Sequence, residues 1–178
     1  MSPSYEQTLN SRHHVYGHDS LIAVADGMPP LVDPPESGLK VVKTTDDGVS
    51  FAGQIRVSGT LHVQWLETTA NPADSTAFLA ASIELDKAEL ERLPYFGGDK
   101  APEVRVDNPE AAVRVAFDKT LAALILDKSK KIAELHGSFL LSDLSIGECG
   151  SPWASGTVVS ASGQKYLGSA QPWDFGDC

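Results

Sequence analysis

The chain has 178 residues, of which 42% are hydrophobic, 21% charged and 7% aromatic. This composition is typical of one globular domain with its own core, and it excludes a disordered acidic chain or a coiled coil. No apolar run approaches the roughly 20 residues that cross a bilayer, so no membrane-spanning segment is expected.

The balance of charge indicates the class of partner. The sequence has 24 acidic and 14 basic side chains, which gives a formal net charge of −10. An acidic surface repels the phosphates of nucleic acids and anionic membrane surfaces. It favours fast association with a basic protein. We therefore expect a protein partner with a basic surface, and neither a nucleic-acid nor a membrane partner.

Two features predict a cytoplasmic location. The first twenty residues contain no apolar segment like that of a secretory signal. The two cysteines, Cys149 and Cys178, suit a reducing compartment where thiols stay free. The sequence leaves open whether they pair, because pairing depends on geometry.

Residues 1–38 are expected to form an irregular leader. Four prolines exclude a helix or a central strand there. They are Pro29, Pro30, Pro34 and Pro35. The leader also holds His13, His14 and His18. Their spacing matches no known metal site, so no metal site is predicted.

The clearest pattern lies in residues 49–65. Every odd position there is apolar or glycine, and nearly every even position is polar. This alternation predicts a β-strand with one buried and one exposed face. One straight strand of that length would span about 55 Å, too long for this domain. We expect a bend at Gly53 or Gly59, or a hairpin turn at Ser58-Gly59.

Alternation returns in residues 77–85, which predicts another strand. A short helix is expected next, because Asp86 and Glu89 have the spacing of a capping box and Pro94 would end it. Residues 95–110 are expected to be mostly loop, and residues 156–170 to form a hairpin that turns near Ser162-Gly163.

Residues 111–146 fit two structures. Alternation over 111–117 favours a strand, followed by a hairpin that turns at 127–130. The spacing of Leu121, Leu124 and Lys128 is helical, and Asn108-Pro109 makes an acceptable helix start. We favour strands because β-rich segments flank the region.

These patterns predict a mainly β, single-domain fold, a bent-strand β-barrel or β-sandwich with one or two short helices. The alternative is an α+β fold with a helix within 109–136. The β-rich domain is placed at residues 39–170, between the leader and a tail of residues 171–178.

Four residues are predicted to bind a partner or ligand. His62 and Arg56 share the polar face of the long alternating segment. Trp153 and Trp173 each follow a proline in an expected loop, where an exposed tryptophan can anchor a protein contact.

No catalytic motif is recognised, because the chain lacks a nucleophile elbow and a phosphate-binding glycine loop. Cys149 is a candidate nucleophile only if His62 or His136 lies near it as a base. No cofactor is predicted.

We expect a non-enzymatic acidic protein-binding module, of the inhibitor, immunity or adaptor type, that acts by surface complementarity to a basic partner. One alternative is a β-barrel that holds a small ligand inside, which requires a cavity around the odd-numbered residues of 49–65. The other is a hydrolase or isomerase that uses His62 or Cys149.

Overall fold

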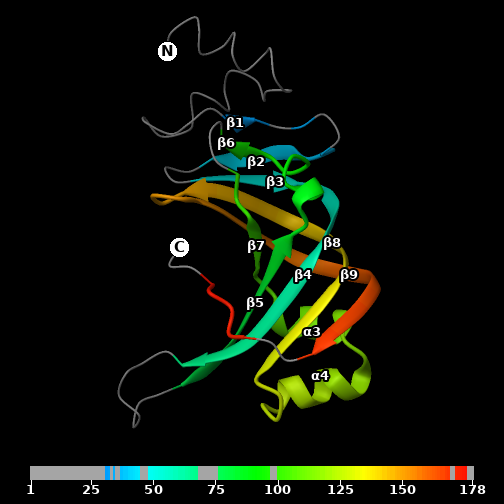
Figure 1. Ribbon diagram of the computed structural model, residues 1–178. Coiled ribbons are helices and arrows are strands. Elements are labelled where there is room, and N and C mark those ends of the chain that lie inside the picture. The colour runs from blue at the N-terminus through cyan, green and yellow to red at the C-terminus, as the bar shows by residue number, and fades with distance from the viewer. Residues whose placement is uncertain are drawn as a thin grey trace, which may run out of the picture.

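The computed structural model describes residues 31–32, 34, 37–44, 48–67, 76–96, 100–168 and 171–175. Seven strands form one sheet in the order β2-β3-β8-β4-β5-β7-β9, and β9 also pairs with β8 (Figure 1). This second pairing closes five strands into a ring. The predicted fold class, a mainly β barrel with few helices, is confirmed.

In chain order the strands of this sheet are β2 (Lys40–Thr44), β3 (Gly48–Ala52), β4 (Gln54–Glu67), β5 (Ala77–Leu85), β7 (Glu103–Val106), β8 (Ile132–Glu148) and β9 (Pro152–Gly168). Two short strands, β1 (Leu31–Val32) and β6 (Tyr95–Phe96), pair with each other separately. The helices are a 3-10 turn η1 (Lys87–Glu89), α3 (Pro109–Ala116) and α4 (Lys119–Leu126).

The ring runs β4-β5-β7-β9-β8 and returns to β4. Its neighbours are antiparallel except for β7 and β9, which are parallel. The two helices connect β7 to β8 and lie beside the lower end of the ring in Figure 1. β3 pairs with the far end of β8, beyond β4, and β2 pairs with β3.

The alternating residues of β4 divide between the inside and the outside of the ring. Ile55, Val57, Leu61 and Val63 are at most 3% exposed and belong to the core. Their even-numbered neighbours point outward. Inward and outward rows are the expected result of a period-2 pattern in a closed sheet.

The predicted bend of this segment lies at Gly53. Gly53 has a φ of 105° and separates β3 from β4, a conformation that glycine adopts without strain. The alternative hairpin at Ser58-Gly59 is wrong, because β4 continues through both residues. Gly59 instead allows close approach of β5, since a Cβ there would lie 2.3 Å from the carbonyl oxygen of Glu84.

The strand favoured for 111–117 is wrong, and the helix foreseen within 109–136 is present as α3 and α4. Pro109 begins α3, where its missing N–H has no intrahelical partner to lose. Asp118 caps α4, accepting a hydrogen bond from the Leu121 N–H at 2.8 Å. Residues 127–130 join α4 to β8, so they are not the turn of a hairpin.

Two smaller expectations are also wrong, and a third holds only in part. Residues 103–106, expected as loop, form β7, whose Val104 and Val106 enter the core. The hairpin expected to turn near Ser162-Gly163 is absent: β9 continues through Gly163, and its antiparallel partner along most of its length is β8. The short helix expected after β5 is present as the 3-10 helix η1, but Asp86 makes no side-chain capping bond to it.

One residue of the predicted leader packs into the core of the domain. Leu31 is fully buried in the core, although it falls within the predicted leader. The three leader histidines lie outside the described residues. The domain boundaries stay a prediction.

No helix in the described parts of the chain has the length and apolar character to cross a membrane.

Candidate functional site

Two polar residues on the outside of the ring are buried. His62 of β4 is 5% exposed and Ser82 of β5 is 0% exposed. They face each other in the β4–β5 ladder, on the side opposite the core. Residues in such outward positions are normally exposed to solvent, so another part of the chain must cover these two.

Trp173 covers the imidazole of His62. Its indole ring stacks on the imidazole of His62, with 3.7 Å between centroids and 8° between planes. Its Nε1–H donates to Oε2 of Glu103 at 2.8 Å, and its backbone N–H donates to Oε1 of Gln64 at 3.1 Å. In Figure 1 the red segment that contains Trp173 lies over the strands of the ring.

The imidazole of His62 lies between two carboxylates. Nδ1 is 3.1 Å from Oε1 of Glu134, and Nε2 is 3.1 Å from Oε1 of Glu84. A carboxylate oxygen only accepts, so both contacts are hydrogen bonds when both ring nitrogens carry a proton. In that form the ring is a cation beneath the indole, a favourable cation–π arrangement.

Further hydrogen bonds hold the surrounding side chains. The hydroxyl of Ser82 donates to Oε2 of Glu103 at 2.9 Å, the same oxygen that accepts from Trp173. Asp86, which follows β5, contacts Nε2 of His136 through both oxygens, at 2.9 and 3.1 Å. These contacts fix the carboxylates on the outer surface of the ring.

We call this surface the His62 face. It consists of the outward side chains of His62, Gln64, Ser82, Glu84, Asp86, Glu103 and Glu134. Four of these seven residues are acidic, and they come from β5, β7, β8 and the turn after β5.

The predicted binding residues separate into a pair and two others. The structure brings His62 and Trp173 into contact. Arg56 lies farther along the outward row of β4 and donates to Ser162 Oγ at 3.2 Å. Trp153 lies in β9 rather than in a loop, opposite Gly147 of β8, so it is not an exposed loop tip.

The net charge of the chain is unevenly distributed. The described residues carry 14 acidic and 13 basic side chains, which leaves ten acidic and one basic side chain elsewhere. The described barrel is therefore close to neutral. The acidic character relevant to its surface is local, and the His62 face is one place where carboxylates gather.

The two catalytic candidates are both engaged. The sequence left the pairing of the cysteines open; Cys149 is disulfide-bonded, so it has no thiol to deprotonate. The argument for a cytoplasmic location from free thiols loses its support. Each ring nitrogen of His62 contacts a carboxylate, and its face is stacked on indole.

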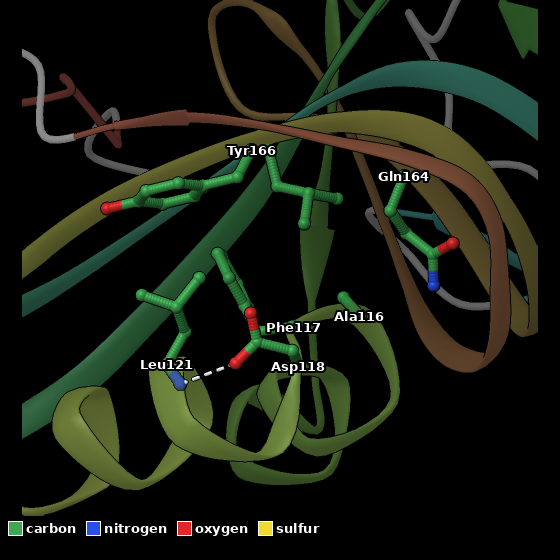
Figure 2. A pocket seen from close by; sticks show the side chains of 7 residues that line it. Ala116, Phe117, Asp118, Leu121, Gln164 and Tyr166 are labelled. Carbon is green, nitrogen blue, oxygen red and sulfur yellow. Dashed lines mark hydrogen bonds between the residues drawn. The ribbon is translucent and has the colours of Figure 1, made fainter.

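A pocket of about 320 Å³ lies between the helices and the β8–β9 hairpin (Figure 2). Its lining residues are Ala116, Phe117, Asp118, Leu121, Leu135, Gln164 and Tyr166. The rings of Phe117 and Tyr166 pack edge to face, 6.2 Å apart. None of the odd-numbered residues of 49–65 lines this pocket. Val57, Leu61 and Val63 instead pack in the core of the ring.

Sequence reasoning missed the carboxylates around His62. Glu84 and Glu134 reach it from β5 and β8, and Glu103 reaches Trp173 from β7. The alternation around 77–85 places Glu84 on an outward row, which was an available signal. Their meeting depends on strand register, which the sequence pattern did not supply.

In the described ranges, no group of three or more histidine, cysteine, aspartate or glutamate side chains is arranged to hold a metal ion. Comparison with protein-family models, with curated proteins and with solved structures finds no match to this chain. The geometry of the chain itself is therefore the basis for a functional proposal.

Proposed function

We propose that this chain is a non-enzymatic binding module that recognises a basic protein through the His62 face. The observation that carries the proposal is the gathering of Glu84, Asp86, Glu103 and Glu134 on one outer surface of the ring. Complementary charge across an interface speeds association and selects the partner.

The topology of the ring supports the choice of this surface. The strand order β4-β5-β7-β9-β8 is that of the OB-fold. As in that fold, β7 and β9 are parallel, and the helices lie between the third and fourth strands of the ring in chain order, β7 and β8. In OB-folds the outer face of the second and third strands is a frequent binding surface. Those strands correspond here to β5 and β7, which contribute Ser82, Glu84 and Glu103 to the His62 face. This support is an analogy of fold.

Many OB-folds bind oligonucleotides, but the chemistry of this face favours another ligand. Binding of a nucleic-acid backbone requires basic side chains that neutralise phosphates. Four carboxylates at the same place oppose phosphate and favour lysine or arginine. We therefore propose a basic protein rather than a nucleic acid.

The enzyme alternative has weaker support. A nucleophilic cysteine needs a thiolate, and Cys149 is disulfide-bonded. A general base needs a ring nitrogen that can reach the substrate, and both nitrogens of His62 contact glutamates.

Native mass spectrometry of the protein recovered from its source cells at low salt tests the proposal. We expect a stoichiometric basic protein that dissociates as the salt concentration rises, because screening weakens attraction between exposed charges. The double variant Glu84→Gln, Asp86→Asn should lose this companion. The matched double variant Glu91→Gln, Glu110→Gln removes two exposed charges outside the His62 face and should retain it.

The proposal is wrong if the companion is acidic or if both double variants retain it equally. Loss of the companion in the Glu91, Glu110 variant alone would move the interface to another surface.

The pocket in Figure 2 favours a second candidate function, the binding of a small aromatic ligand. Its wall combines the apolar and aromatic groups of Phe117, Leu121, Leu135 and Tyr166 with the polar side chains of Asp118 and Gln164. An NMR titration with toluene should shift the signals of Phe117 and Tyr166. A Leu121→Trp variant, which fills the pocket, should show no such shifts. Equal shifts in both proteins would contradict this candidate.

A further inference from the structure

The segment of residues 171–175 makes contacts on the His62 face that resemble those of a bound peptide. One backbone N–H and one side-chain N–H of Trp173 are both paired, and its ring is stacked. Gln171, Pro172 and Asp174 on either side are exposed. Trp173 is therefore the aromatic anchor of the segment on this face, much as one aromatic residue anchors a short peptide motif.

The receiving surface is built for this anchor. Glu103 presents a carboxylate oxygen to the indole N–H, and Gln64 presents an amide oxygen to the backbone N–H. His62, itself fixed at both nitrogens, forms a flat and nearly buried floor for the ring. Three separate side chains thus specify an aromatic ring that carries an N–H donor.

The resident segment offers the His62 face no positive charge. Residues 171–175 include one acidic residue, Asp174, and no basic residue. The His62 face around them presents Glu84, Glu103 and Glu134. A segment with lysine or arginine beside its tryptophan would suit this surface better, because its positive charge would meet these carboxylates.

We infer that residues 171–175 are an internal ligand of the His62 face, which a tryptophan-bearing, basic, extended segment of the partner protein replaces. The inference rests on the proposed function and adds the chemistry of the partner's anchor to it. The internal segment competes with the partner. The apparent association constant of the partner is therefore its intrinsic value multiplied by the fraction of molecules in which the face is uncovered.

The test uses two blocked pentapeptides and the full chain. One peptide has the sequence QPWKF, which copies residues 171–175 with lysine in place of the aspartate. The other, QPAKF, lacks the indole. Calorimetric titration of the Trp173→Ala variant with QPWKF should give at least tenfold tighter binding than titration of the wild type, and QPAKF should bind neither protein. Adding Glu103→Gln to Trp173→Ala should weaken the binding of QPWKF.

Equal affinity of the wild type and the Trp173→Ala variant for QPWKF, or equal binding of the two peptides, would overturn the inference. A second measurement does not depend on folding of the variant. Excess QPWKF added to the wild type should shift the indole N–H signal of Trp173 toward that of a free indole, and an unmoved signal would also overturn the inference.

Failure of this inference and failure of the proposed function give different results. If QPWKF binds as expected but no basic companion is recovered, the proposed function fails and the aromatic site stands. If a basic companion binds through Glu84 and Asp86 while QPWKF does not bind, the proposed function stands and the internal-ligand inference fails.

Discussion

Replacement of Glu103 by glutamine tests how Trp173 is held on the His62 face. Oε2 of Glu103 accepts two hydrogen bonds, from Nε1 of Trp173 at 2.8 Å and from Oγ of Ser82 at 2.9 Å. Glutamine keeps the size of the side chain and an acceptor oxygen but removes the negative charge. The variant therefore changes the strength of these bonds with little change in packing.

The expected effect follows from the difference between charged and neutral hydrogen bonds. A hydrogen bond to a charged group contributes about 1.5–3 kcal/mol, and a neutral one about 0.5–1.5 kcal/mol. Only the bond to Trp173 is lost when the segment detaches, so the variant should favour the detached state by about 1 kcal/mol. This free energy corresponds to a roughly fivefold larger population of molecules with an uncovered face.

Hydrogen exchange of the indole N–H, followed by NMR, measures this population. The Glu103→Gln variant should exchange the Trp173 indole proton roughly fivefold faster than the wild type. Glu110→Gln, which removes a charge from α3, serves as the control and should leave the rate unchanged. Equal rates in all three proteins would refute the role of Glu103. A wild-type indole that exchanges like a free one would refute the seating of Trp173 itself.

Two further predictions concern the barrel. Gly59→Ala should lower the free energy of unfolding by about 2 kcal/mol in urea denaturation, because its Cβ would meet the backbone of Glu84 at 2.3 Å. Gly156→Ala is the control: the atom nearest to its added Cβ is 3.4 Å away, so the free energy of unfolding should change by less than about 1 kcal/mol. Equal effects of the two substitutions would contradict the pairing of β4 with β5. Burial raises the pKa of Asp107, against the opposing charge of Arg105. The folded protein should therefore lose stability as pH rises from the usual aspartate pKa through this raised value. Asp107→Asn should abolish that loss when unfolding is measured as a function of pH. An Asp107→Asn variant that is less stable than the wild type at neutral pH would contradict the raised pKa of Asp107.

The sequence predicted the long strands because their pattern is local. Alternation over residues 49–65 required only that one face be buried, and β3 and β4 follow it with the bend at Gly53. The same reasoning failed at 111–117, where the alternating residues also suit a helix. The capping bond that Asp118 accepts from the Leu121 N–H and the proline at the start of α3 support the helical structure that alternation did not predict.

The candidate site was predictable only in part. His62 and Trp173 were each selected for a local reason, but nothing in the sequence indicated that they touch across more than a hundred positions. The carboxylates of Glu84 and Glu134 reach His62 because β5 and β8 flank β4 in a particular register. Register and ring closure are set by the packing of the entire core, so these contacts become visible only in the folded chain.

The central claim is that the His62 face is the surface that meets a partner. Carbodiimide labelling of carboxyl groups, read by mass spectrometry, tests it directly on the complex and on the free chain. In the free chain Glu84 and Asp86 are 50% and 41% exposed, and Glu91 and Glu110 are 75% and 66% exposed. We predict that binding of the partner protects Glu84 and Asp86 from labelling and leaves Glu91 and Glu110 unchanged. Protection of Glu91 or Glu110, with unchanged labelling of Glu84 and Asp86, would contradict the claim.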